Sequence, residues 1–357
     1  MRGRLLLLAV ILSSCGGQNS VVLNPGPGGG SPPPTTQDWL IPKNQVFDGG
    51  PGRDGIPALE NPEKIPAEEA GYLLEQEFVL GFYDGNQAIA YPHSIMDWHE
   101  IVNETINNKL LAITYCPLTG TGIGWDRESY GQESTFGVSG LLYNNNLIAF
   151  DRNTNSNWAQ LTLMSVNGPL IGTEMGTFPL VETRWGVWKA MFPDTRVVSR
   201  NTGVARSYGT YPYGDWKTNE DALFFPVVPD DRRLNRKERV HGVLIDGKAK
   251  VYRFGSFQTT NTLIADTFNG ADIMIIGNSD NFIVSFFQVL ADGSRPVFTA
   301  VDENNVILTD NEGNSWDIFG YAVSGPRLGE QLIPTQSFMG YWFAFGSFYP
   351  TPEIFDF

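Results

Sequence analysis

AITYCPLTGTGIGWDR (112–127) joins an apolar run to a turn rich in glycine and threonine. Its first residues are mostly apolar, β-branched or aromatic, which is typical of a buried strand. Residues 117–122 then have the proline and glycine content of a tight turn, and an apolar strand pattern resumes after them. The stretch therefore predicts two strands joined by a turn, with Cys116 at the start of that turn.

The same pattern of strands and turns recurs along the chain. EFVLGFYDGNQAIAYP (77–92) has two apolar runs joined by Asp-Gly-Asn, which is a β-hairpin signal. STFGVSGLLY (134–143) and NLIAFDR (146–152) predict further strands. A short helix is expected within IMDWHEIVN (95–103). A second is expected within ETRWGVWKAMFPDT (182–195), where aromatic residues have helical spacing before a proline. We expect a mainly β fold with a few short helices.

Two parts of the chain share weak sequence similarity in the same order. VLGFYDGNQAIAY (79–91) resembles VHGVLIDGKAKVY (240–252), and NGPLIG (167–172) resembles SGPRLG (324–329). The aromatic spacing that begins at Trp185 also recurs near the C-terminus. Three matches in one order indicate an internal duplication, with chance agreement between aromatic-rich segments as the alternative. We expect two related β-rich halves packed into one unit.

These patterns divide the chain into five segments. Its 357 residues, 41% of them hydrophobic, allow one large domain or two ordinary ones. A Gly- and Pro-rich stretch before the first strands is typical of a tether. The expected segments are a lipoprotein signal (1–15), a disordered tether (16–46), a first β-rich half that carries the candidate site (47–200), a connector (201–235) and a second, degenerate β-rich half (236–357).

The N-terminal segment MRGRLLLLAVILSSC (1–15) has a basic start and an apolar run too short to cross a bilayer. Its end resembles the lipobox of bacterial lipoproteins, which implies that Cys15 becomes the lipidated first residue of the mature chain. An ordinary secretory signal is the alternative, and either one exports the protein. Because Gly16 rather than aspartate follows Cys15, we expect a lipid-anchored protein of the cell envelope, at the outer membrane and either periplasmic or surface-exposed.

Charge and cysteine content narrow the possible partners. The formal net charge of −15 argues against nucleic acid and anionic membrane surfaces as partners. The expected membrane contact is the lipid on Cys15, and a protein or small-molecule partner stays open. With Cys15 lipidated, Cys116 is the one free thiol of the mature chain. In an oxidising envelope such a thiol is buried, metal-bound, reactive or paired with another chain.

Two chemical interpretations of the region around Cys116 stay open. Cys116, His99 and His93 offer one sulfur and two imidazole nitrogens, a set that suits copper or zinc. Alternatively, Cys116 is the nucleophile of a hydrolase or transferase, with His99 as base and Glu100 or Asp126 orienting it. No nucleophile motif supports the second interpretation, and an oxidising compartment penalises a bare thiolate. We therefore favour metal or ligand binding over a Cys-dependent enzyme.

A third interpretation makes Cys116 a small buried residue at a strand end. Trp98, Tyr143 and Trp158 would then serve a ligand-, carbohydrate- or partner-binding surface, with an aromatic core as the alternative explanation for them. We expect Cys116 and His99 to lie in contact within one pocket of the first half. The side chains expected around that pocket are Thr119, Thr121, Glu100 and Asp126.

Several motifs, taken in order, resemble a known family over most of the chain from about residue 47. These motifs include DGIPAL (54–59), AYPHSIMDWHEIVN (90–103), TYCPLTGTG (114–122), ETRWGVWKAMFPDT (182–195) and KERVHGV (237–243). They are similar to the domain of unknown function 3179 family. The family pattern is matched at His99, Glu100, Cys116, Thr119 and Thr121. The resemblance implies family membership and carries no activity, so the interpretations above stay open.

Overall fold

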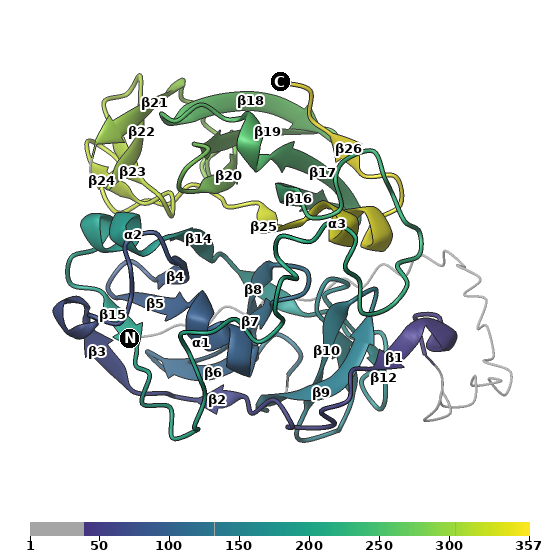
Figure 1. Cartoon of the computed structure of the whole chain (residues 1–357). Coiled ribbons are helices and arrows are strands. Elements are labelled where there is room, and N and C mark those ends of the chain that lie inside the picture. Colours follow the sequence, from purple (N-terminus) through teal and green to yellow (C-terminus); the bar gives the residue numbers. More distant parts are fainter. Residues whose placement is uncertain (1–38, 132, 304) are drawn as a thin grey trace, which may run out of the picture. The chain divides into compact units, whose positions relative to one another are not determined.

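Strands dominate the computed structural model, which describes residues 39–131, 133–303 and 305–357 (Figure 1). The α-helices in these ranges are three short elements, α1 (His93–His99), α2 (Trp185–Met191) and α3 (Trp342–Phe348). The expected mainly β fold with a few short helices is confirmed. No helix of the described ranges is long and apolar enough to cross a membrane. Cys15 and most of the expected tether lie outside the described residues.

The hairpin predicted around residues 84–86 is present between β4 (Phe78–Tyr83) and β5 (Ala88–Pro92). Asp84 closes the turn, because its Oδ1 accepts hydrogen bonds from the backbone N–H groups of Asn86 and Gln87, both at 3.0 Å. The prediction is confirmed, and the second strand of the hairpin leads directly into α1.

Three sheets are built from the first part of the chain, and they include the strands predicted at 112–116, 134–143 and 146–152. Beyond β4 and β5, the strands are β1 (Val46–Asp48), β2 (Leu59–Glu60), β3 (Lys64–Pro66), β6 (Ile101–Ile106), β7 (Lys109–Cys116), β8 (Thr121–Asp126), β9 (Phe136–Tyr143), β10 (Asn146–Asp151), β11 (Asn157–Ala159), β12 (Met164–Asn167), β13 (Gly176–Phe178), β14 (Val181–Arg184) and β15 (Arg196–Val198). Sheet A has the order β1-β9-β10-β11-β12, sheet B the order β13-β8-β7-β6-β2, and sheet C the order β14-β4-β5-β15-β3.

The C-terminal part of the chain forms three more sheets. Its strands are β16 (Arg239–Ile245), β17 (Lys248–Arg253), β18 (Thr262–Phe268), β19 (Ala271–Gly277), β20 (Ile283–Phe287), β21 (Phe298–Glu303), β22 (Val306–Asp310), β23 (Ser315–Asp317), β24 (Ala322–Ser324), β25 (Gln336–Tyr341) and β26 (Glu353–Ile354). Sheet D has the order β25-β16-β17-β26, sheet E the order β18-β19-β20, and sheet F the order β21-β22-β23-β24. Short 3₁₀ helices are η1 (Lys43–Gln45), η2 (Ala67–Glu69) and η3 (Phe254–Ser256).

The two sets of sheets have matching strand orders. The run β14-β4-β5-β15 in sheet C matches β25-β16-β17-β26 in sheet D, and in each run only the last pair is parallel. The antiparallel run β6-β7-β8 in sheet B matches β18-β19-β20 of sheet E. The run β9-β10-β11-β12 in sheet A matches all of sheet F. A repeated strand order therefore accompanies the sequence similarity, while the division into two related halves and their residue boundaries stay a prediction.

A close contact between a glycine and an aromatic ring occurs at equivalent places in sheets C and D. A Cβ atom added to Gly81 of β4 would lie 2.1 Å from the ring of Trp188 in α2. A Cβ atom added to Gly242 of β16 would lie 1.9 Å from the ring of Phe345 in α3. Because each strand is pressed against a helix by this aromatic residue, only glycine leaves room for the ring. These are the positions that the sequence similarity pairs.

A buried tryptophan is bound in the same way in sheets A and F. The indole N–H of Trp158 donates to Asp151 Oδ2 at 3.2 Å, and that of Trp316 donates to Asp310 Oδ2 at 2.9 Å. Both indole rings are fully buried. Each tryptophan lies on the strand that follows the one its aspartate ends, so the tryptophan–aspartate pair is part of the repeated architecture.

The two parts of the chain share a core. Strand β25 lies beside β8 (Figure 1), and the backbone N–H of Tyr341 donates to the carbonyl of Thr119 at 2.8 Å. The hydroxyl of Tyr349 donates to the carbonyl of Leu161 at 2.6 Å. One hydrophobic cluster contains residues of both parts, among them Cys116 and Trp342. The sheets therefore pack as one compact unit, which includes the described residues from 39 to the C-terminus.

The segment between β15 and β16 contains no helix or strand, although all of residues 199–238 are described. Side-chain hydrogen bonds fix it to the turn after β7. The indole N–H of Trp216 donates to the carbonyl of Leu118 at 2.9 Å, and the hydroxyl of Tyr211 donates to the carbonyl of Pro117 at 3.2 Å. We call residues 201–235 the connector. It packs over this turn and over α1.

Candidate functional site

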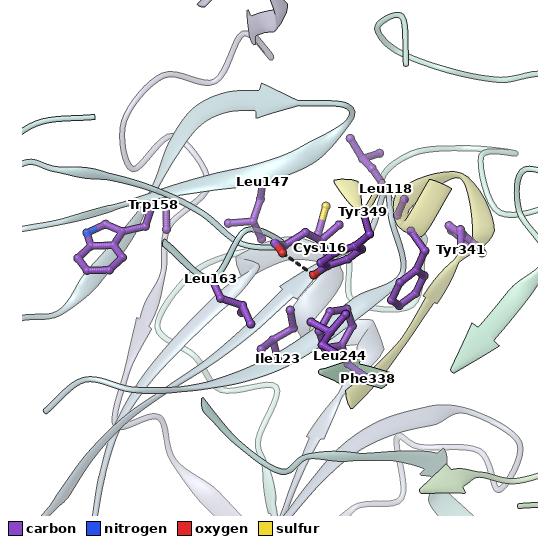
Figure 2. Packing of buried hydrophobic residues seen from close by; sticks show 14 of the residues in the cluster. Cys116, Leu118, Ile123, Leu147, Trp158, Leu163, Leu244, Phe338, Tyr341 and Tyr349 are labelled. Atoms are coloured by element: carbon purple, nitrogen blue, oxygen red, sulfur yellow. Dashed lines mark hydrogen bonds between the residues drawn. The ribbon is translucent and has the colours of Figure 1, made fainter. Parts of the chain in front are cut away.

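Cys116 ends β7 and lies inside the protein. Its side chain is 1% exposed and belongs to a hydrophobic cluster with Leu118, Leu147 and Tyr349 (Figure 2). The thiol lies 3.6 Å from the carbonyl oxygen of Asn145. Burial, together with the negative charge of Glu100, raises the pKa of the Cys116 thiol to about 11. The group is therefore a neutral thiol at physiological pH, in a position that solvent does not reach.

Thr119 and Thr121 belong to a buried hydrogen-bond network beside Cys116. Their hydroxyl oxygens lie 2.8 Å apart, and the Thr121 hydroxyl donates to Gln160 Oε1 at 2.7 Å. The side-chain amide of Asn146 donates to Thr119 Oγ1 at 3.0 Å and to Gln160 Oε1 at 2.8 Å. Because these groups satisfy one another, the two threonines fix the turn after β7 rather than face a ligand.

Both ring nitrogens of His99 have partners other than Cys116. Nδ1 lies 2.6 Å from the carbonyl of Pro57, and Nε2 lies 2.7 Å from the hydroxyl of Tyr208. A carbonyl can only accept, so Nδ1 carries the proton and Nε2 accepts from Tyr208. Burial lowers the pKa of His99, which favours this neutral form. In this arrangement His99 joins α1 to the loop before β2 and to the connector.

His93 and His99 are the two ends of α1, and they point in different directions. Six residues of helix rotate a side chain by about 240°, so the two rings cannot share a face. The His93 ring lies 4.4 Å from the ring of Tyr115, and its Nε2 lies 3.5 Å from Glu182 Oε2. Among the residues that the structure describes, no group of three or more His, Cys, Asp or Glu side chains is arranged to hold a metal ion.

Glu100 lies at the C-terminal end of α1 with its carboxyl group inside the protein. The side chain is 5% exposed, and Oε1 accepts a hydrogen bond of 3.0 Å from the hydroxyl of Tyr213. Burial raises the pKa of Glu100 to about 7, Tyr213 lowers it, and the charge of Asp97 raises it further. Since Glu100 also acts on the pKa of Cys116, these two predicted site residues are electrostatic neighbours.

The structure separates Asp126 from the turn that holds Cys116. Cys116 pairs with Thr121 at one end of the β7–β8 ladder, whereas Asp126 pairs with Leu111 at the other. Five residues of strand separate the two ends by about 17 Å. Asp126 instead caps its own turn, where Oδ1 accepts from the backbone N–H of Glu128 at 2.9 Å.

The three aromatic residues considered for a binding surface lie in different places. Trp98 is on α1, and its indole N–H donates to the carbonyl of Thr210 at 3.1 Å. Tyr143 ends β9 with its ring 5.2 Å from that of Phe348. Trp158 is fully buried at its aspartate partner. They do not form one platform, and Trp158 is part of the core.

A cavity of about 240 Å³ lies against the outer side of α1, and we call it the α1 cavity. Its polar lining includes His93, Ser94, Asp97 and Lys217, the last of which comes from the connector. Asp97 is 5% exposed, with Oδ2 at 3.3 Å from the ammonium group of Lys217. Burial raises the pKa of Asp97 to about 6, although the charge of Lys217 acts in the opposite direction. The remaining lining residues are Glu77, Phe78, Tyr208, Gly209, Thr210 and Tyr211.

Unsatisfied polar atoms gather at the α1 cavity and behind it. Among the described residues, His93 Nε2, Ser94 Oγ, Asp97 Oδ1 and Glu182 Oε2 are buried without a hydrogen-bond partner. Glu182 forms an ion pair with Arg239, which also donates to the carbonyl of Gly120 at 2.6 Å. A series of charged side chains therefore extends from the α1 cavity, at Asp97 and Lys217, to the ion pair of Glu182 and Arg239 between the two parts of the chain.

Sequence reasoning identified His93 but missed Ser94 and Asp97. Their signal was present in the sequence, since positions 93, 94 and 97 lie on neighbouring faces of one helix turn. The partners of this group gave no such signal. Lys217, Glu182 and Arg239 are between 85 and 146 positions away from Asp97 or His93 in the sequence, and only the fold brings them together.

A comparison with models of protein families finds a match for this chain. The model of the family described as protein of unknown function (DUF3179) matches residues 53–352. The chain belongs to this family. The DUF3179 match includes α1, the turn after β7, the connector and, among the described strands, all except β1 and β26. No curated protein and no solved structure matches the chain.

Proposed function

We propose that this DUF3179 protein binds a small polar ligand in the α1 cavity. One observation carries the proposal. Two polar side chains of one helix turn, Ser94 and Asp97, line the cavity, and each has a buried atom without a hydrogen-bond partner among the described residues. His93 also lines the cavity, with its Nε2 at 3.5 Å from Glu182 Oε2. Leaving such an atom unsatisfied costs about 1–3 kcal/mol. A ligand that reorders these side chains and bonds to them would recover that free energy.

The lining defines the chemistry of the ligand. Asp97 and Ser94 can accept hydrogen bonds, while Ser94 and Lys217 can donate them. The aromatic ring of Tyr211 lies 4.0 Å from the Lys217 ammonium group and adds an apolar wall. A small ligand with hydroxyl or amide groups would use both the donors and the acceptors.

The chemistry of Cys116 gives less support to the other two functions. A nucleophile or a metal ligand needs the thiolate form, and burial holds the Cys116 pKa at about 11. His99 would have to break its bonds to Pro57 and Tyr208 before acting as a base or ligand. We therefore prefer ligand binding at α1 to a metal site or a Cys-dependent hydrolase.

The proposed location is the cell envelope, with the folded unit attached through a lipid on Cys15. The support is the sequence of the N-terminal segment alone. Replacing Cys15 with serine should remove the protein from the membrane fraction or block its processing. A Cys15→Ser protein that still carries the lipid would contradict the anchor.

Native mass spectrometry against a panel of monosaccharides, hydroxycarboxylates and amino acids tests the binding proposal. At least one compound should bind the purified protein, and Ser94→Ala and Asp97→Asn should each weaken that binding. Asp194→Asn is the matched control, because Asp194 is exposed on the turn after α2. Binding that is absent throughout the panel, or that survives both α1 substitutions unchanged, would contradict the proposal.

A further inference from the structure

A second cavity lies at the other end of α1, beside Glu100, and we call it the Glu100 cavity. Its volume is about 170 Å³. We propose that it binds a small organic cation, in which an ammonium group is joined to an apolar body. The lining residues are Gly49, Pro51, Ile56, Glu100, Leu118, Val138, Gly140, Leu141, Leu142, Tyr213, Phe224 and Phe225. This site is separate from the α1 cavity and goes beyond the function proposed above.

The walls of the Glu100 cavity are apolar apart from one carboxyl group and one phenol. Aliphatic side chains come from the loop after β1, from β9 and from the turn after β7, and aromatic rings come from the connector. Such a cavity favours a ligand with a hydrocarbon body, because burying that body removes apolar surface from water. The single acidic group then sets the orientation of the ligand.

The Glu100 carboxyl group has no cationic partner in this cavity. Its one hydrogen-bond donor, Tyr213, is neutral, and no Lys, Arg or His is among the described residues that line the walls. A carboxylate at 5% exposure is stabilised poorly unless a positive charge accompanies it. An ammonium group of the ligand would supply that charge, whereas a carboxylate or phosphate ligand would be repelled.

Aromatic rings in the wall of the Glu100 cavity suit the same ligand. The ring of Phe224 stacks on Trp216 at 4.9 Å, and the ring of Phe225 stacks on Phe47 at 4.6 Å. The Tyr213 ring lies 6.0 Å from that of Phe224. Faces of aromatic rings attract cations, and clusters of such rings bind organic ammonium groups. Stacking restricts the Phe225 ring, whereas Phe224 is 53% exposed on its other side.

The backbone of Glu100 is also fixed. Its N–H donates to the carbonyl of Met96 at 2.8 Å, and its carbonyl accepts from the N–H of Tyr115 at 2.7 Å. The residue has a φ of 58°, a conformation that costs a non-glycine residue about 1–2 kcal/mol. These backbone hydrogen bonds hold the strained residue in the wall of the cavity.

Isothermal titration calorimetry of the full-length protein with n-hexylammonium tests the proposal, with n-hexanol and hexanoate as neutral and anionic probes. Hexylammonium should bind at least about tenfold more tightly than hexanol, and hexanoate should not bind measurably. Glu100→Gln should weaken hexylammonium binding by at least about tenfold, and Tyr213→Phe by a smaller factor. Circular dichroism and melting curves would establish that both variants fold.

Proton release supplies a second readout. At pH 6 the Glu100 carboxyl group is largely protonated, because its pKa is about 7, so binding of a cation should release a proton to the buffer. Titrations in phosphate and MES, which both buffer near pH 6 and have different ionisation enthalpies, would report this release in the wild type. The Glu100→Gln protein should show none.

Separate variants distinguish this site from the α1 cavity. Ser94→Ala should leave hexylammonium binding within about twofold of the wild type, even if it abolishes binding in the α1 cavity, because Ser94 carries no charge and does not line the Glu100 cavity. The proposal is overturned if hexanol binds as tightly as hexylammonium, if folded Glu100→Gln binds the cation as the wild type does, or if the cation does not bind at all.

Discussion

Around α1, burial moves ionisable side chains toward their neutral forms. The pKa of Asp97 rises to about 6 and that of Glu100 to about 7, while the pKa of His93 falls. The same effect keeps Cys116 a thiol. The region therefore contains several groups whose charge can change with a ligand or with pH, although few of them are exposed.

Cys116 should be unreactive in the folded protein. Its pKa of about 11 leaves little thiolate at pH 7.5, and its 1% exposure excludes a reagent. The reaction of the native protein with a thiol reagent should follow the rate of unfolding and become fast only in denaturant. Rapid stoichiometric labelling of native protein would contradict this and restore Cys116 as a candidate nucleophile.

Glu100 should make the protein less stable as pH rises. The carboxyl pKa is about 7 in the folded state and near 4.5 when unfolded, so the folded state holds the proton more tightly. This contribution is fully present below pH 4.5 and is lost as pH rises through 7, by up to about 3 kcal/mol.

Urea unfolding at pH values from 5 to 9 would measure the effect of Glu100. The free energy of unfolding of Glu100→Gln should change less between pH 5 and pH 8 than that of the wild type. Glu128→Gln, at an exposed position, is the control and should follow the wild type. Parallel profiles for wild type and Glu100→Gln would contradict the shifted pKa.

How far a candidate site can be predicted from this sequence depends on single residues. The sequence directs attention to α1 and to the turn after β7, and Glu100 and Cys116 are electrostatic neighbours there. The signal from His99 was ambiguous. A sequence does not distinguish a histidine that hydrogen-bonds to a carbonyl and a phenol from one that binds a metal. Lys217 gave none, since nothing in its local sequence ties it to Asp97.

At the scale of elements, two β-hairpins are closed by Asn-Asn turns that have different roles. Asn144 and Asn145 join β9 to β10, with φ values of 47° and 60°. The Asn145 side chain accepts from the N–H groups of Phe224 and Phe225, both at 3.0 Å, and donates to the Phe225 carbonyl at 2.8 Å. This turn therefore holds the connector, whose rings line the Glu100 cavity.

Replacing Asn145 with alanine should destabilise the protein and loosen the connector. It removes three hydrogen bonds and puts alanine at a φ of 60°, which together should cost about 2–4 kcal/mol. Asn108→Ala is the matched control, because Asn108 has a φ of 64° in the exposed turn between β6 and β7. Denaturant unfolding and proteolysis within residues 201–235 are the measurements. Equal losses in the two variants would show that the conformation, not the connector, determines the cost.

The repeated glycine–aromatic contact makes a paired prediction. Gly81→Ala and Gly242→Ala each place a methyl group within about 2 Å of an aromatic ring, so each should lower the free energy of unfolding by at least about 2 kcal/mol. Gly71→Ala is the control, because a Cβ atom at Gly71 meets nothing within 4 Å. Thermal melting of the three variants would measure this. A tolerated substitution at either strand glycine would contradict the equivalence of the two contacts.

Strands and hairpins were predictable because their signals are local. The hairpin closed by Asp84 and the strand that ends at Cys116 follow from residue types within a few positions. In the sequence, the matching of sheet A with sheet F was visible only in the short fragments NGPLIG (167–172) and SGPRLG (324–329). A strand needs apolar residues on its buried face and little else, so sequence similarity decays while strand order is retained.

At the scale of the whole molecule, the last prediction is that the two parts of the chain do not fold alone. Rings of both parts meet in the core, where Trp188 lies 6.0 Å from Phe319 and Tyr83 lies 5.6 Å from Tyr321. The hydroxyl of Tyr349 is bound inside the first part. Cutting the chain would expose both clusters and leave such polar groups unsatisfied.

Residues 39–200 and 236–357, expressed separately, should therefore lack a cooperative unfolding transition, whereas the intact unit should unfold in one. Calorimetry would test the intact protein through the equality of the calorimetric and van't Hoff enthalpies, and circular dichroism and tryptophan fluorescence should give the same denaturant midpoint. A fragment that melts cooperatively, or two separated transitions in the intact protein, would mean that each set of sheets carries its own core. One transition would instead place the α1 cavity, the Glu100 cavity and the connector within a single folding unit, so that a ligand in either cavity would stabilise all of it.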